Sequence, residues 1–110
     1  MSIVEKKFLH KGLGLFWDSG GSDKSGITAS WANVLRAELV HLNTATCLAD
    51  ILAGLGVLKK AKLLSGSTDR YSMEVNGNWR LTFTCVNPDT GEVNKIDLED
   101  FHRPGGAKRH

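Results

Sequence analysis

Apolar positions in the first half of the chain recur at helical spacing. The longest stripe runs through residues 27–43, where its members are Trp31, Val34, Leu35, Leu39 and Leu42. A period near 3.6 residues predicts an amphipathic helix. Thr28 or Ser30 can cap its N-terminus, because a hydroxyl oxygen there accepts a hydrogen bond from a backbone N–H that has no partner inside the helix.

Two shorter helices are predicted on either side of this one. Residues 9–17 repeat large apolar side chains at nearly helical spacing, although Gly12 and Gly14 each weaken a helix by roughly 1 kcal/mol relative to alanine. A further helix begins at Thr46, whose hydroxyl can cap it, and ends at a glycine in the segment 54–56.

Alternation replaces the helical period after residue 70. Apolar and polar side chains alternate in residues 71–75 and again in 79–85, and the Asn-Gly pair between these runs supplies the positive φ angles that a tight hairpin needs. A turn at residues 87–91 leads into another strand, which runs toward residue 102. The β-branched and aromatic residues of the segment 3–8 predict a short first strand.

This order of elements predicts an α+β fold of two layers, with the N-terminal helices packed on one face of an antiparallel sheet. A length of 110 residues with 41% apolar content suits a single compact domain, expected over residues 1–102. The polar, glycine-containing segment 103–110 is expected to be a flexible tail. The apolar phase of the hairpin faces the helices, so the other sheet face is expected to be open and to present Ser72, Glu74, Arg80, Thr82 and Thr84.

Charge and cysteine content narrow the function classes only slightly. The net charge of +2 does not indicate a nucleic-acid-binding protein by itself, but residues 59–80 contain five basic and two acidic side chains. Cys47 and Cys85 are not in a metal or redox spacing, so we expect reduced thiols and no cofactor. Without an apolar run that suits a signal peptide or a membrane span, a cytoplasmic protein is expected.

Arg80 is the first candidate for chemistry, because it stands on the outward phase of the hairpin. Asp100 and His102 come near the end of the last predicted strand, in the same phase as Leu98. A fixed cation, a carboxylate and a group that titrates near neutral pH are a usable set for proton transfer at a phosphodiester. The alternative is a solvated arginine and an ordinary charged strand end.

Four segments in order carry a resemblance to a known family: FLHKGLGLFWDSG, LRAELVHLNTATCLADI, YSMEVNGNWRLTF and LEDFH. Together they resemble the HigB-type plasmid maintenance killer proteins of the RelE and ParE toxin superfamily. The resemblance implies a RelE-like fold and a toxin that inhibits translation as a ribosome-dependent endoribonuclease cleaving mRNA. It also implies a HigA-like helix-turn-helix antitoxin as partner, with operator DNA contacted only through the antitoxin complex and no membrane partner.

The resemblance also implies roles for individual residues. Arg80 would hold the scissile phosphate, and His102, beside Asp100, would protonate the leaving 5′ oxygen. Phe101 stands where the family usually has tyrosine, so base stacking is retained and the hydroxyl is lost. Basic and aromatic side chains expected to bind RNA are Lys60, Lys62, Arg70 and Phe101.

One position departs from the family pattern. The family commonly carries LHxLKG ahead of the hairpin, with its histidine as the base, whereas an ungapped count places Ala61 at that point. Glu74 or a lysine of lowered pKa could take the role of the base. Two alternatives to a ribonuclease therefore stay open: a catalytically weakened RelE-fold binding protein that acts through its antitoxin complex, and a ParE-like topoisomerase inhibitor. The set of Arg80, Asp100 and His102 favours the ribonuclease.

Overall fold

The computed structural model describes residues 7–53, 61–76, 79–103 and 106–109, with the backbone alone from residue 101 onward. The helices are α1 (Lys11–Asp18), the 3₁₀ helix η2 (Ala29–Trp31), α2 (Ala32–Thr44) and α3 (Leu48–Ala53). The strands are β1 (Lys62–Leu63), β2 (Arg70–Asn76), β3 (Trp79–Asn87), β4 (Glu92–Arg103) and β5 (Gly106–Arg109). Within these residues the strands form one antiparallel sheet in the order β1-β2-β3-β4-β5.

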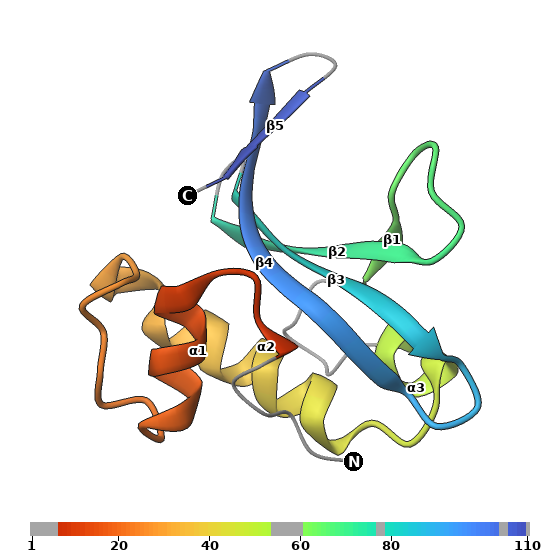
Figure 1. Cartoon of the computed structure of the whole chain (residues 1–110), viewed down its shortest axis with the longest axis horizontal. Coiled ribbons are helices and arrows are strands. Elements are labelled where there is room, and N and C mark those ends of the chain that lie inside the picture. The colour runs from red at the N-terminus through yellow and green to blue at the C-terminus, as the bar shows by residue number, and fades with distance from the viewer. Residues whose placement is uncertain (1–6, 54–60, 77–78, 104–105, 110) are drawn as a thin grey trace.

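The helices gather on one face of this sheet, and the far end of β4 extends with β5 beyond the helical layer (Figure 1). The core between the layers contains apolar side chains from both, and its fully buried members include Leu13, Phe16, Leu35, Leu39, Leu42, Ile51, Leu81, Phe83, Ile96 and Leu98. The predicted α+β fold of two layers is therefore confirmed.

Helix α1 is confirmed where residues 9–17 predicted it, and Gly12 has a packing role. A Cβ atom added to Gly12 would lie 2.4 Å from the carbonyl oxygen of Gly26, so the helix meets the following loop backbone to backbone. The ring Nδ1 of His10 accepts a hydrogen bond from the N–H of Leu13 at 3.0 Å and caps the helix.

Helix α2 starts later than its apolar stripe predicts, and the predicted hydroxyl caps are wrong. Neither η2 nor α2 has a side-chain cap bond. The N–H of Trp31 donates to the backbone oxygen of Thr28 at 2.9 Å, so a 3₁₀ turn takes the place of the cap. Before α3, the hydroxyl of Thr46 donates to the carboxylate of Asp50 at 2.6 Å. The predicted end of that helix at 54–56 lies outside the described residues.

The hairpin of β2 and β3 is confirmed, with a bulge between Glu74 and Asn76, while the turn residues 77–78 lie outside the described residues. Strand β1 was not predicted, because two residues are too short to show alternation. The predicted strand at 3–8 falls mostly outside the described residues, and within it Phe8 forms a parallel bridge to Ile96.

The segment expected to be a flexible tail differs most from expectation. Strand β4 continues to Arg103, and residues 106–109 form β5 along its edge, with Asp100 opposite Lys108 and Glu99 opposite Arg109. The pairing satisfies backbone groups that an unpaired edge of β4 would expose to solvent. Composition predicted a tail because short polar strands carry no apolar alternation.

Candidate active site

The candidate site lies on the sheet face that the core side chains do not occupy. We call this the polar face and define it by the side chains that share the phase of Arg80 through the strand register: Lys62, Arg70, Ser72, Glu74, Arg80, Thr82, Thr84, Asp97 and Glu99. Residues directly opposite each other in an antiparallel ladder share a face. The outward phase predicted for the hairpin is therefore confirmed by its register.

Arg80 stands in the middle of a row of charges across this face. The register places Glu74 of β2 on one side of it and Glu99 of β4 on the other. A half-buried arginine therefore lies between two carboxylate-bearing positions. Its Nη1 also donates to the backbone oxygen of Trp79 at 3.3 Å.

The centre of the polar face is not open, which corrects the expectation from the sequence. Thr82 has 0% of its surface exposed and Asp97 has 1%, although both lie on the phase opposite the core. The long side chain of Arg70 accounts for the burial of Thr82, because its guanidinium donates to the Thr82 hydroxyl at 2.8 Å.

The guanidinium of Arg70 donates four hydrogen bonds on the polar face. Its Nη1 donates to the hydroxyl of Thr84 at 3.0 Å and to the backbone oxygen of Lys95 at 2.8 Å. Its Nη2 donates to the hydroxyl of Thr82 at 2.8 Å and to Oε2 of Glu99 at 3.4 Å. Each terminal nitrogen carries two hydrogens, so these bonds use all the terminal N–H groups of the guanidinium.

Glu99 is the residue that sequence reasoning missed. Its Oε2 accepts a hydrogen bond of 2.5 Å from the Thr82 hydroxyl and forms an ion pair with Arg70, and its side chain keeps 17% of its surface exposed. Oε2 is thus held from two sides, and the side chain as a whole is not fully buried. Only the register of β4 against β3 reveals that it stands opposite Arg80.

A bulge in β4 sets this register. Lys95 has a φ of 49°, unusual for a residue other than glycine, and the pairing with β3 shifts between Thr82 and Thr84. The sequence does carry a signal for it, because the buried Val93 and Ile96 are three residues apart where an undisturbed strand places them two or four apart.

The other predicted site residues are divided among different places. Asp100 lies opposite Trp79 and so shares the phase of Leu98, as predicted, which is the opposite phase from Arg80. Lys62 lies exposed on β1, in register with Ser72. Predicted positions whose side chains lie outside the described residues are Lys60, Phe101 and His102.

Ala61 and Glu38 bear on the question of the missing base. Ala61, where the family pattern has its histidine, is 7% exposed and belongs to the core. Glu38 on α2 is fully buried, and within the described residues its carboxylate oxygens have no hydrogen-bond partner. Burial, followed by the negative charge of Glu74, raises the pKa of Glu38 to about 8.

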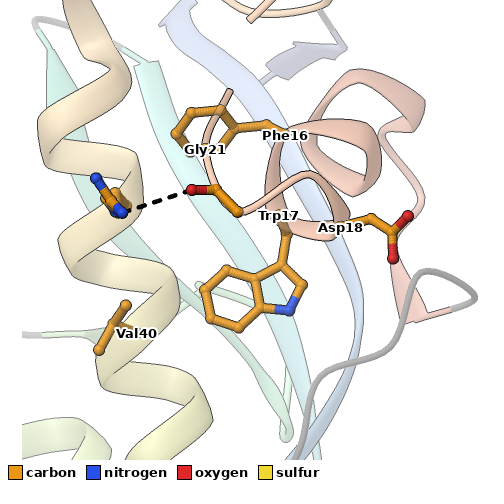
Figure 2. A pocket seen from close by; sticks show the side chains of 7 residues that line it. Phe16, Trp17, Asp18, Gly21 and Val40 are labelled. Carbon is orange, nitrogen blue, oxygen red and sulfur yellow. Dashed lines mark hydrogen bonds between the residues drawn. The ribbon is translucent and has the colours of Figure 1, made fainter. Parts of the chain in front are cut away.

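A separate pocket of about 380 Å³ lies in the helical layer, between the end of α1 and helix α2 (Figure 2). Its lining residues are Phe16, Trp17, Asp18, Gly20, Gly21, Arg36 and Val40. The guanidinium of Arg36 reaches the backbone oxygen of Gly20 at 3.5 Å, and the Trp17 indole lies on the side of Val40. The pocket shares no residue with the polar face.

Neither a metal site nor a membrane-spanning helix is present among the described residues. No cluster of three or more histidine, cysteine, aspartate or glutamate side chains suits a metal ion there, and Cys47 and Cys85 are free thiols. None of the helices in those ranges combines the length and the apolar character that crossing a membrane requires.

Comparison with known proteins gives two matches. Residues 6–102 match the family described as the RelE-like toxin of the type II toxin-antitoxin system HigB. The chain is also 32% identical over 98 residues to Endoribonuclease HigB of Proteus vulgaris, an alignment that covers 88% of this chain and 98% of that protein. Membership of a type II system implies a cognate antitoxin as partner. The chain belongs to the HigB family of RelE-like toxins.

Proposed function

We propose that this toxin is an endoribonuclease that cuts messenger RNA on the ribosome, in the cytoplasm. The observation that carries the proposal is the similarity to a protein named as an endoribonuclease, which extends over almost the whole of both chains. Arg80 on the polar face, between two carboxylates, supplies a cation where a phosphodiester can be bound.

The proposed chemistry is attack of the RNA 2′-OH on the adjacent phosphorus. Arg80 counters the negative charge that grows on the phosphoryl oxygens in the transition state. His102 protonates the leaving 5′ oxygen, and the neighbouring carboxylate of Asp100 favours the protonated imidazole. Phe101 stacks on a base, and Lys60 and Lys62 attract the RNA backbone.

The partner proposed for the toxin is a HigA-like helix-turn-helix antitoxin, which brings the pair to operator DNA. It neutralises the toxin by covering the polar face or by keeping the complex off the ribosome. A stable complex of this kind typically buries on the order of 1,600 Å² in total. Recovery of no small helix-turn-helix protein with the toxin from its native host would contradict this part of the proposal.

Expression of the chain alone in bacteria, followed by mapping of new 5′ ends in cellular messages, tests the activity. Growth arrest with new in-frame cuts in translated messages is expected, and His102→Ala slows the cut by about 100 to 10,000 fold in single-turnover assays on programmed ribosomes. His102→Gln is nearly as damaging, since an amide does not readily donate a proton. Cleavage by both variants within threefold of the wild type would remove His102 as the acid.

A catalytically weakened binding protein is the second candidate, because Ala61 is buried where the family pattern has its base. In that case messages stay intact while the antitoxin complex and its operator binding persist. Growth arrest with DNA damage and intact messages would instead support a topoisomerase inhibitor.

A further inference from the structure

We propose that Glu99 is the base that removes the proton from the RNA 2′-OH, and that Arg70 positions it. The inference rests on the proposed ribonuclease function. It assigns the role left vacant by Ala61 to a residue that has no counterpart among the sequence-based candidates, and it makes Arg70 a positioning residue in place of an RNA-binding one.

The position of Glu99 in the strand ladder is the first argument for its role as the base. Directly opposite residues in an antiparallel ladder have Cβ atoms about 4.5 to 5.5 Å apart, so the side chains of Glu99 and Arg80 leave the sheet next to each other. A base for this reaction must lie next to the group that holds the phosphate, because the attacking 2′ oxygen is only a few bonds from phosphorus. The Glu99 side chain keeps 17% of its surface exposed, so it is not enclosed in the core.

The fixed orientation of this carboxylate is the second argument for its role as the base. Within the described residues, Oε2 of Glu99 accepts hydrogen bonds from Thr82 at 2.5 Å and from Arg70 at 3.4 Å. This leaves Oε1 to take a proton. Catalytic groups need this kind of support, because a displacement of about 1 Å can cost a hundredfold in rate.

The alternative bases have less support. Glu74 flanks Arg80 on the other side, but it borders the bulge at Glu74/Asn76, near the end of the hairpin. Glu99 instead pairs on both sides, with Arg80 of β3 and Arg109 of β5. Lys62 lies exposed on the edge strand β1, two strands away from Arg80. The ladder therefore favours Glu99.

The role of Arg70 follows from its saturated guanidinium. With both terminal nitrogens committed to Thr84, Lys95, Thr82 and Glu99, it has no terminal N–H left for a bidentate phosphate contact. Its planar fork holds the carboxylate of Glu99 in one place.

In the proposed reaction, proton removal by Glu99 accompanies attack of the 2′ oxygen on phosphorus. Oε1 of Glu99 takes the proton of the 2′-OH as the 2′ oxygen forms its bond to phosphorus. The bond between phosphorus and the 5′ oxygen breaks, and the leaving oxygen takes a proton from the acid. The products are a 2′,3′-cyclic phosphate on one fragment and a 5′-OH on the other.

Single-turnover cleavage of a message programmed on ribosomes tests the base, with Glu74→Gln as the matched control because it removes the other carboxylate beside Arg80. We expect Glu99→Gln to lower the rate constant by about 100 to 10,000 fold and Glu74→Gln to stay within tenfold of the wild type. The amide still accepts hydrogen bonds from Thr82 and Arg70, so thermal melts of both variants should match the wild type closely.

Glu99→Asp guards against misfolding, since it keeps a carboxylate on a shorter side chain and should cut faster than Glu99→Gln. Three results overturn the assignment: cleavage by Glu99→Gln within threefold of the wild type, a large loss in Glu74→Gln alone, or equal losses in the Asp and Gln variants. A wild-type protein that makes no cut and no cyclic phosphate overturns the proposed function itself, so the two failures are distinguishable.

Arg70→Lys tests positioning against RNA binding, because lysine keeps the charge but cannot span the four acceptors. We expect the rate constant of the bound complex to fall by about 10 to 100 fold, with affinity for programmed ribosomes nearly unchanged. Weakened affinity with an unchanged rate constant would show that Arg70 binds RNA and would overturn the positioning role.

Discussion

At Thr82 the polar face of the sheet is buried as completely as the helix-covered face, but by different chemistry. Leu81 and Phe83 on the helix-covered face are 0% exposed, and so is Thr82, which lies between them on the polar face. Apolar contacts bury the first face, and they are non-directional and tolerate substitutions that conserve volume. Directed hydrogen bonds from one arginine to four acceptors bury the second. The helix-covered face therefore supplies most of the stability, while the polar face fixes the positions of individual groups.

The largest expected effect lies on the helix-covered face. Phe83→Ala removes a fully buried ring from the core and should lower the free energy of unfolding by about 3 to 5 kcal/mol. Denaturant unfolding followed by circular dichroism measures it. Phe83→Leu is the matched control, and a loss as large as that of the alanine variant would mean that shape outweighs volume in this core.

Arg70→Met should have the next largest effect, and it tests whether the polar face depends on one side chain. The substitution keeps much of the apolar stem but leaves Glu99, Thr82 and Thr84 without their shared donor. We expect a loss of about 2 to 4 kcal/mol in the free energy of unfolding. Lys62→Met, on the same face but exposed, should change it by no more than about 0.5 kcal/mol. Equal effects of the two variants would show that the stability of the polar face does not depend on the hydrogen bonds of Arg70.

Glu38 is buried neither as an apolar side chain nor through hydrogen bonds. Its carboxyl group has no hydrogen-bond partner in the described residues. Its pKa is about 8 in the folded chain against an ordinary value of 4.5, so the folded state holds the proton more tightly. Stability from this group is therefore fully present below about pH 4.5 and is lost as the pH rises toward 8.

Glu38→Met should remove that dependence and raise the free energy of unfolding at pH 8 by on the order of 2 kcal/mol, since each pKa unit corresponds to about 1.4 kcal/mol. Unfolding curves of both proteins between pH 5 and about pH 9 measure it. Parallel pH profiles of the variant and the wild type would show that Glu38 is ionised in the folded protein.

The smallest effect on stability is expected for Arg80→Ala. The half-buried side chain lies outside the core, so we expect a change of about 0.5 kcal/mol in the free energy of unfolding together with loss of toxicity. Melting temperature and growth assays on the same variant separate the two effects. A fall in melting temperature large enough to explain the lost toxicity would make Arg80 a structural residue.

Sequence patterns predicted the layers better than they predicted the polar face. The helical stripe that ends at Leu42 and the alternation from Tyr71 to Cys85 both reflect burial against a core, which side-chain type reports directly. The link between Arg70 and Glu99 depends on register, and the bulge at Lys95 changes which residue of β4 stands opposite each residue of β3. Periodicity marks the bulge only through the three-residue spacing of Val93 and Ile96, and it does not identify the residue of β3 that stands opposite each residue of β4.

The predicted caps and tail failed for a related reason. The hydroxyl of Thr28 could have capped the helix. Instead, the backbone oxygen of Thr28 accepts a hydrogen bond from the N–H of Trp31 and closes a 3₁₀ turn. Strand β5 is specified by the edge of β4 that it covers and not by its own composition. Local sequence therefore indicates which residues could form a cap or a strand, and tertiary contacts decide which of them do.

Strand β4 also determines when the sheet can finish folding. The N–H of Leu9 donates to the backbone oxygen of Ile96 at 2.7 Å, so the start of the described chain joins a strand near its other end. Contacts between such distant segments slow folding, because the loop between them must close before they contribute stability. During synthesis, helices α1 to α3 and the first hairpin emerge before Ile96 and Glu99 exist. The polar face can therefore assemble only after β4 has been synthesised.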